Sequence, residues 1–286
     1  MAELLFGTGG TPHSARSGAT IDGIERIVEL GLGCMEVEFV RGVRMNEPSA
    51  RQVAEVAARE GIKLSAHAPY YINFNAHEPE KIRASQERVL QTARIAALCG
   101  AQSVVFHPAF YLGDPPEKAY DTVKKYLEEV VQRLKQENNR VWIRPELMGK
   151  QSQFGTVEEI LNLCTEVEGV APCIDFSHWH ARTGIFNSYQ EFASILLQVK
   201  ERLGRAALDD MHIHLSGIKY GGKGEIKHLD LKESDLEYKE LLKTLRDYEV
   251  KGLVICESPN LEDDALLLQA TYNSLLKAGQ GNLQIS

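Results

Sequence analysis

Eight short β-rich segments alternate along this chain with eight segments of helical periodicity, and this order restricts the fold to a few α/β architectures. The candidate strands are residues 4–7, 34–39, 63–67, 103–107, 140–146, 171–175, 210–215 and 253–257. The candidate helices are residues 21–30, 48–60, 79–99, 116–137, 156–167, 189–202, 233–247 and 261–276. Strict alternation over 286 residues predicts one (β/α)8 TIM barrel of α/β class, a single domain over residues 1–286, with residues 279–286 as a flexible tail.

The rival architecture is an open, doubly wound sheet. Such a sheet usually has fewer strands and a phosphate-binding glycine turn. Residues 6–10, Phe-Gly-Thr-Gly-Gly, are rich in glycine but do not complete G-x-G-x-x-G. Gly31, Gly61 and Gly100 follow the first three helices, where a glycine is expected to end each helix. The closed barrel is therefore the favoured fold.

Metal-ligand residues recur at the ends of the predicted strands. Six of the eight strands end at or beside a His, Asp or Glu: His67, His107, Glu146, Asp175 with His178 close behind, His214 and Glu257. A barrel of parallel strands gathers its strand C-termini on one face, so these side chains would converge there. Imidazoles and carboxylates are ligands of zinc and manganese. The pattern predicts a metal site with more than one ion.

Each of these residues also has a local alternative. A lone histidine behind an apolar strand is more often a core or surface residue, and His178 stands in an aromatic run that could simply pack. Glu146 could pair with Arg144, because alternation places both on one face of a strand. His212 and His214 also share a face. His214 is the outer of the two and the better ligand candidate, and His212 is expected deeper, as a supporting or core residue.

Composition indicates an ordinary cytoplasmic protein, which we expect to be monomeric and without a membrane partner. No apolar run approaches the roughly 18 residues of a membrane span. The five cysteines form no C-x-x-C pair and are interpreted as buried, reduced thiols. The net charge of −8 argues against a nucleic-acid partner. Bound cations among the carboxylates would weaken that argument.

Several sequence motifs of this chain resemble motifs of the endonuclease IV family of metal-dependent apurinic/apyrimidinic endonucleases. Residues 67–73, His-Ala-Pro-Tyr-Tyr-Ile-Asn, are similar to its H-x-x-Y-x-I-N motif. Four further phrases appear in the family's order: Phe-His-Pro at 106–108, Cys-Ile-Asp-Phe-Ser-His at 173–178, His-Leu-Ser at 214–216 and Glu-Ser-Pro-Asn at 257–260. The resemblance spans about residues 4–260. It implies a xylose-isomerase-like barrel with three clustered metal ions, usually zinc.

The resemblance also implies a ligand set. One ion would be held by His67, His107 and Glu146. A second would be held by the bridging Glu146 together with Asp175, His214 and Glu257. A third would use His178 and His228. The family's Asp in its D-x-H pattern falls here on Ile226, so a weak third site is expected unless Glu225, Asp230 or His180 supplies a ligand. The expected cofactor is two or three Zn²⁺ ions, with Mn²⁺ as the other choice.

The activity implied by the resemblance is hydrolysis of the phosphodiester on the 5′ side of abasic sites in double-stranded DNA, as part of base excision DNA repair. Glu146 and Glu257 are the expected catalytic residues. Tyr70 and Tyr71 stand where the family places residues that enter the DNA. Arg41 and Arg44 are candidates for phosphate contacts, as are three lysines: Lys219, Lys223 and Lys227. Two other functions stay open: a sugar isomerase or epimerase on the same barrel, and a non-catalytic metal- or DNA-binding descendant.

Overall fold

The barrel predicted from the sequence is confirmed by a computed structural model, which describes residues 3–283. Its eight parallel strands are β1 (Leu4–Gly9), β2 (Cys34–Glu38), β3 (Lys63–His67), β4 (Ser103–Phe106), β6 (Trp142–Pro145), β8 (Cys173–Asp175), β9 (Met211–Leu215) and β12 (Gly252–Cys256). They are ordered β6-β4-β3-β2-β1-β12-β9-β8. Two isolated parallel bridges, Ile143 to Val170 and Glu146 to Cys173, join the two ends of this sheet. The sheet is thus a nearly closed barrel, and the open doubly wound alternative is wrong.

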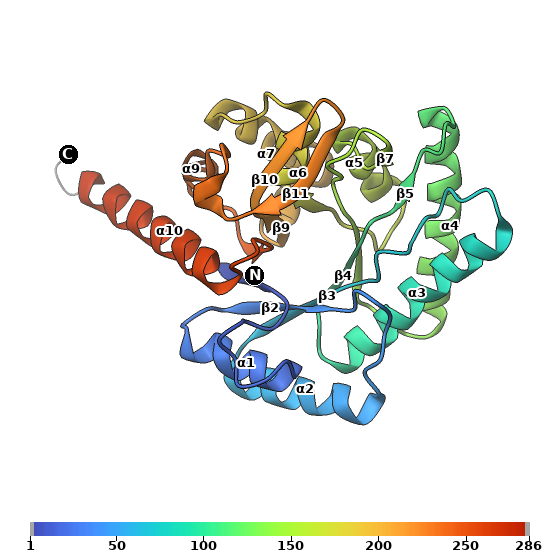
Figure 1. Cartoon of the computed structure of the whole chain (residues 1–286), viewed down its shortest axis with the longest axis horizontal. Coiled ribbons are helices and arrows are strands. Elements are labelled where there is room, and N and C mark those ends of the chain that lie inside the picture. Colours follow the sequence, from blue (N-terminus) through green and yellow to red (C-terminus); the bar gives the residue numbers. More distant parts are fainter. Residues whose placement is uncertain (1–2, 284–286) are drawn as a thin grey trace.

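Helices surround the strands as an outer layer (Figure 1). They are α1 (Thr20–Glu29), α2 (Glu47–Glu60), α3 (Pro79–Leu98), α4 (Pro116–Gln136), α5 (Val157–Glu166), α6 (Phe176–Thr183), α7 (Tyr189–Leu203), α8 (Arg205–Leu208), α9 (Tyr238–Asp247) and α10 (Glu262–Leu283). The short helices α6 and α8 were not predicted. Residues 231–233 form a 3₁₀ turn, so α9 begins later than expected. Residues 279–283 continue α10, and residues 284–286 of the predicted tail lie outside the described residues.

Local signals explain where several helices begin and end. Thr156 and Glu159 form a reciprocal cap at the start of α5, and Ser188 and Glu191 do the same for α7. Gly61 ends α2 in a left-handed conformation with φ 74°, as its position in the sequence predicted.

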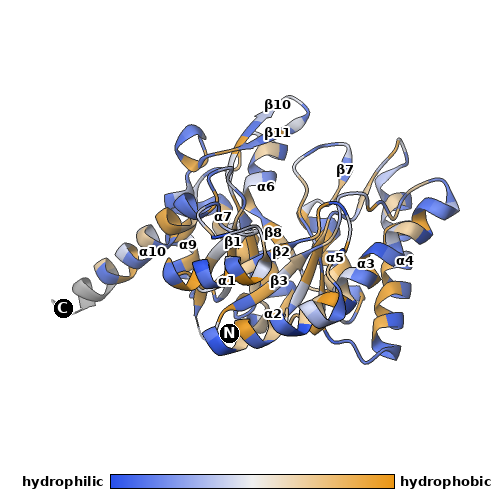
Figure 2. Cartoon of the chain, turned by 60° about the horizontal axis from the view of Figure 1, so that its bottom comes forward, coloured by the Kyte–Doolittle hydropathy of each residue, from blue (hydrophilic) through white to orange (hydrophobic). Residues whose placement is uncertain are grey.

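The main hydrophobic core lies between the outside of the barrel and the helices (Figure 2). Outward-facing strand residues such as Phe6, Leu64 and Ile213 are buried against it. A fully buried aliphatic or aromatic side chain contributes about 1.5–3 kcal/mol. Inside the barrel, Cys34, Leu253 and Ile255 form only a small separate apolar cluster. Most of the hydrophobic stabilisation therefore comes from outside the barrel, and its interior can hold polar groups.

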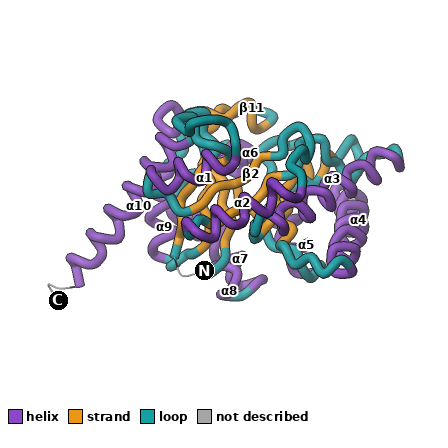
Figure 3. The backbone as a smooth tube through the Cα atoms, turned by 90° about the horizontal axis from the view of Figure 1, so that it is seen from below, coloured by secondary structure: helices purple, strands orange, loops and turns teal. Residues whose placement is uncertain are grey.

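Two small antiparallel pairs extend the barrel at the carboxyl ends of its strands. β10 (Gly217–Gly221) and β11 (Gly224–Leu229) form a hairpin, and β5 (Ala109–Phe110) pairs with β7 (Gln153–Phe154). The hairpin projects beyond the barrel strands at the edge of the molecule (Figure 2). It lies at the opposite end from α8 (Figure 3). The hairpin was not predicted, because its glycines and lysines hide the alternation of a strand.

The cysteines agree with the compositional expectation of reduced thiols. All five cysteines are free thiols, four of them buried. Within residues 3–283, no helix has both the length and the apolar character needed to cross a bilayer.

Gly7 makes the contact between β1 and β2 possible, and this can be tested. A Cβ atom at Gly7 would lie 1.8 Å from the carbonyl oxygen of Cys34. Gly7→Ala must push the two strands apart, and we expect a loss of about 3 kcal/mol or more in the free energy of unfolding. Gly18→Ala is the control, since a Cβ there meets no atom of the described residues within 4 Å. Urea unfolding should show a change within about 0.5 kcal/mol for this control. Equal stability of the two variants would contradict the packing described.

Candidate metal centre

Glu146 lies at the middle of a group of histidines at the carboxyl end of the barrel. It directly follows β6 and is fully buried. Its Oε2 atom lies 3.3 Å from Nε2 of His67 and 3.1 Å from Nε2 of His107. Its Oε1 atom lies 3.1 Å from Nδ1 of His178 and 3.3 Å from Nδ1 of His214. Each carboxylate oxygen therefore faces a different pair of imidazoles, which is the arrangement of a group that bridges two ions.

The alternative pairing of Glu146 with Arg144 is wrong. Arg144 Nη2 lies 3.0 Å from Oδ2 of Asp210, and Nη1 donates to the carbonyl of Pro172 at 2.9 Å. Two residues of strand separate Arg144 from Glu146, a rise of roughly 6.6 Å. The long arginine side chain extends from there toward Asp210, which precedes β9 at the amino end of the barrel. The side chains of Arg144 and Glu146 share one face of the strand, but this does not bring their charges into contact.

The first cluster contains His67, His107 and Glu146, whose ligand atoms lie within 4.8 Å of one another. Nδ1 of His67 lies 2.7 Å from the carbonyl of Ala68 and donates to it, so Nε2 is the ring atom that faces Glu146. Burial alone would lower the pKa of His67, but the hydrogen bond to Glu146 and the nearby Glu38 raise this pKa to about 10. A protonated His67 thus supplies the positive charge that a cation would otherwise bring.

The second cluster contains Glu146, Asp175, His214 and Glu257, again with ligand atoms within 4.8 Å. Among the described residues, three buried atoms here have no hydrogen-bond partner: Oε1 of Glu146, Oδ2 of Asp175 and Nδ1 of His214. Leaving a buried polar atom unpaired costs about 1–3 kcal/mol, and more when it is charged. Two acids and an imidazole are ligands that a divalent cation takes up directly. The residues present therefore fit a metal ion.

The carboxylates of this region respond differently to burial. Burial raises the pKa of Asp175, and with Glu146 nearby it reaches about 6 in spite of His178. Burial would also raise the pKa of Glu146, but His107 and His214 outweigh it and hold that pKa well below its usual range. Glu146 is therefore charged at neutral pH although its own side chain is fully buried. The site is stable only with a compensating positive charge.

The third cluster contains His178, Glu225 and His228. Nε2 of His178 lies 3.4 Å from Nε2 of His228 and 3.6 Å from Oε2 of Glu225. Each ring donates from Nδ1 to a main-chain carbonyl, His178 to Leu147 at 3.0 Å and His228 to Glu257 at 3.1 Å. Two Nε2 lone pairs therefore face each other at the separation that two ligands of one ion adopt.

A β-bulge brings Glu225 into this cluster. Lys219 pairs with Lys227 and Tyr220 pairs with Glu225, so Ile226 is an extra residue in β11. Without the bulge, residues three apart on a strand would face opposite sides. With it, Glu225 and His228 share one side, and Ile226 is 57% exposed to solvent. Glu225 thus brings a carboxylate to the cluster in which the sequence predicted the loss of one at Ile226.

The other two substitutes named from the sequence do not join the third cluster. Nε2 of His180 lies 3.1 Å from Oδ1 of Asp235, and its Nδ1 lies 3.1 Å from the carbonyl of Phe186. His180 thus helps to hold the loop after the hairpin. Asp230 is not among the ligand atoms of the cluster.

Two carboxylates on β2, Glu36 and Glu38, were missed in the sequence. They come close to Glu257 inside the barrel mouth. Burial raises the pKa of Glu38 to about 8, assisted by the negative charges of Glu36 and Glu257 and opposed by His67. The signal was present as Glu36-Val37-Glu38, two acids on one face of a strand that is otherwise apolar.

A pocket of about 420 Å³ opens over the three clusters, lined by residues that include Tyr70, Lys150, Glu225 and Glu257. The Tyr70 ring lies 5.3 Å from that of His107, and Tyr71 is 69% exposed. Arg41 and Arg44 are exposed between β2 and α2, and Lys219, Lys223 and Lys227 are exposed on the hairpin. Hollows of 560 and 630 Å³ near Trp142 lie at the other end, and none of the ligand clusters of residues 3–283 borders them.

Comparison with known proteins identifies a family match and several relatives of this chain. Residues 24–277 match the family described as xylose isomerase-like TIM barrel. An uncharacterized protein of Methanocaldococcus jannaschii is 46% identical, over 95% of this chain and 98% of the relative. A probable endonuclease 4 of Mycoplasma genitalium is 23% identical, over 69% of this chain and 67% of the relative.

Two solved structures share the fold and align with this chain equally well. Endonuclease IV from Thermus thermophilus aligns with a TM-score of 0.74 and 17% identity, over 96% of this chain and 99% of that one. A D-tagatose 3-epimerase-like protein also aligns with a TM-score of 0.74 and 17% identity, over 97% and 99% of the two chains. At this identity the likeness concerns the fold alone.

The role of Glu225 can be separated from that of Ile226 by substitution. Glu225→Gln should weaken zinc binding at the third cluster by at least about tenfold, because an amide is a poorer ligand than a carboxylate. Ile226→Asp should leave zinc binding unchanged, since this side chain faces solvent. Chelator competition on the two purified variants measures both effects. Tighter binding by Ile226→Asp, or none lost in Glu225→Gln, would contradict the bulge geometry.

Proposed function

Because this chain belongs to the xylose isomerase-like TIM barrel family, we propose that it uses its three ligand clusters to hydrolyse phosphodiesters, as an apurinic/apyrimidinic endonuclease in DNA repair. The observation that carries the proposal is the adjacency of the clusters: two share Glu146, and His178 of the third lies 3.1 Å from the same carboxylate. Adjacent cations suit a phosphate, which offers several oxygens to bind. The ordered motifs and the relatives named probable endonuclease 4 support the same choice.

The chain's own residues have defined tasks in this reaction. His67, His107 and Glu146 would hold one ion, Glu146, Asp175, His214 and Glu257 a second, and His178, Glu225 and His228 a third. Bound zinc or manganese would supply an activated water near neutral pH and offset the charge of the phosphate oxygens. Glu257 lines the pocket and lies 3.4 Å from Nδ1 of His214, where it can orient the attacking water and accept its proton.

DNA would be held by the rim of the pocket. Arg41, Arg44 and the three hairpin lysines are exposed cations beside it, suited to phosphate contacts in spite of the net charge of −8. Tyr70 and Tyr71 project at the mouth and could fill the space left by a missing base. An abasic nucleotide is readily turned out of the helix, because it has no base to unstack.

The second candidate is a metal-dependent sugar epimerase. The D-tagatose 3-epimerase-like structure aligns as well as endonuclease IV does, and the cluster of Glu146, Asp175, His214 and Glu257 would serve a single ion. That function leaves His178, Glu225 and His228 without a task. Main-chain carbonyls nevertheless orient the rings of His178 and His228 toward each other. The third cluster therefore favours the endonuclease.

A direct assay tests the proposal. Protein loaded with zinc or manganese should cut a duplex that carries one abasic site, on its 5′ side, and should leave an intact duplex and a panel of ketoses unchanged. Glu146→Gln should lower the rate by about 100-fold or more, with a matching loss of metal. Epimerised ketose together with an uncut abasic duplex at saturating metal would replace the proposal by the second candidate.

Substitution of Tyr71 tests the DNA-facing rim. Tyr71→Ala should lower cleavage of the abasic duplex by about tenfold, the worth of one lost stacking contact, with metal content unchanged. Trp142→Ala is the matched control, since this ring is 42% exposed at the far end of the barrel. An equal effect of the two substitutions, or none of Tyr71→Ala, would count against insertion of this side chain into DNA.

A further inference from the structure

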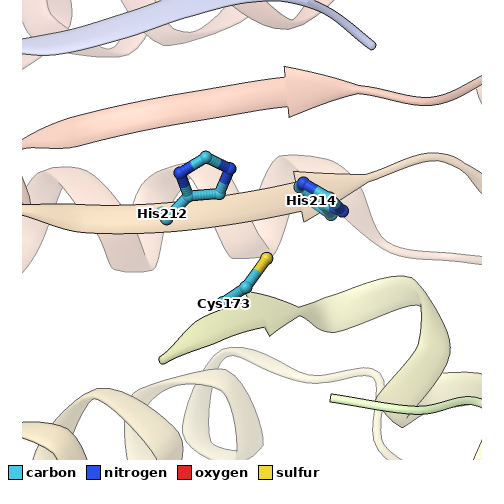
Figure 4. A group of neighbouring side chains, drawn as sticks. All are labelled: Cys173, His212 and His214. Carbon is cyan, nitrogen blue, oxygen red and sulfur yellow. The ribbon is translucent and has the colours of Figure 1, made fainter. Parts of the chain in front are cut away.

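A second set of metal-ligand side chains lies deeper in the barrel than the centre described above. Cys173 of β8 pairs in register with His212 of β9, and His214 follows on the same face of β9. Figure 4 shows the thiol of Cys173 directed from its strand toward the two imidazoles on the next strand. The ligand atoms of the three residues lie within 4.8 Å of one another, and all three side chains are buried.

Glu36 of β2 contacts the two histidines of this set from across the barrel. Its Oε2 atom lies 3.0 Å from Nε2 of His212, and its Oε1 atom lies 3.0 Å from Nε2 of His214. Within the described residues, Oε1 of Glu36 and both Nε2 atoms have no hydrogen-bond partner in spite of these short contacts. Buried nitrogen and oxygen atoms at these separations are also spaced as ligands of one ion are. Two ligands at about 2.0–2.1 Å from zinc lie roughly 3.3 Å apart.

Neighbouring hydroxyls hold two of these groups in position. Ser65 donates to Oε2 of Glu36 at 2.6 Å. Nδ1 of His212 lies 3.3 Å from Oγ of Ser103, which leaves Nε2 directed at Glu36. Outer hydrogen bonds of this kind fix the ring orientation and tautomer of metal-binding histidines. None of these groups has a task in the proposed phosphodiester hydrolysis, apart from His214.

We propose that Cys173, His212, His214 and Glu36 bind a further divalent ion inside the barrel, beneath the clusters around Glu146. Thiolate, imidazole and carboxylate are all ligand types of zinc, and four of them fill its tetrahedral coordination. Thiolate and carboxylate together offset the charge of the ion. Binding releases the thiol proton to solvent. When the second cluster also holds its ion, the ring proton of His214 is released too, since both of its nitrogens then act as ligands. His214 uses Nε2 here and turns Nδ1 toward Glu146 and Glu257, at 3.3 and 3.4 Å, so its ring links the two levels.

Sulfur makes this ion distinguishable from those of the upper clusters, whose ligands are only oxygen and nitrogen. The full-length protein is produced in zinc-depleted medium with cobalt(II). We expect a sulfur-to-cobalt charge-transfer band in the near ultraviolet, and we expect Cys173→Ala to abolish it and to lower the metal content by about one ion per chain. Cys256→Ala is the control, a buried strand cysteine that belongs to no ligand cluster of residues 3–283. A band that survives in Cys173→Ala, or that is lost in Cys256→Ala, overturns the proposal.

A measurement on the unaltered protein removes any dependence on how the variants fold. X-ray absorption at the zinc edge should show a sulfur neighbour at about 2.3 Å. Its absence from zinc-replete protein overturns the proposal. The outcome is independent of nuclease activity: a chain with zinc-bound sulfur that leaves abasic DNA uncut retains this site, and a chain that cuts abasic DNA but has no zinc-bound sulfur lacks it.

Discussion

The charge of the fully buried Glu146 carboxylate is the constraint on which the rest of the centre depends. An isolated buried carboxylate is strongly unfavourable, and it persists only with paired positive charge. Here four imidazoles contact its two oxygens at 3.1–3.3 Å. They come from β3, from the loop after β4, from α6 and from β9, so the register of the whole barrel determines whether the charge is compensated. Metal ions would take over this compensation and release the imidazoles to act as ligands.

The fold can include this buried charge because most of its hydrophobic stabilisation comes from elsewhere in the molecule. The large core lies outside the barrel, between strands and helices, and the apolar cluster inside it is small. Replacing a buried ion pair by aliphatic side chains often leaves the free energy of unfolding unchanged or raises it. Glu36 and His212 form such a pair inside this barrel. Their presence indicates that the interior is built for binding at some cost in stability, as active sites often are.

Prediction from the sequence succeeded where the signal was local. Strand ends at His67, His214 and Glu257 follow short apolar runs, and parallel strands in a barrel bring their ends to one face whatever the details of closure. Prediction failed where the position of a side chain depended on pairing between segments that are distant in the sequence. The bulge at Ile226 exists only because Tyr220 pairs with Glu225, and no local feature of Glu-Ile-Lys-His reveals it. The alternative pair of Arg144 with Glu146 also rested on local spacing, whereas the partner in the structure, Asp210, is 66 residues away in sequence.

The three clusters differ in how they are supported, and this difference bears on function. The first two are built mainly on barrel strands, whereas Glu225 and His228 of the third come from the β10–β11 hairpin. The hairpin is held close to the loop after β6: a Cβ atom at Gly149 would lie 2.8 Å from Cβ of Glu225 and 3.0 Å from Cδ2 of His178. In TIM barrels, chemistry changes through the loops at this face, while the barrel itself is retained. Equal likeness of the fold to an endonuclease and to an epimerase is then expected, and the proposed endonuclease differs from the second candidate in its use of the hairpin residues Glu225 and His228.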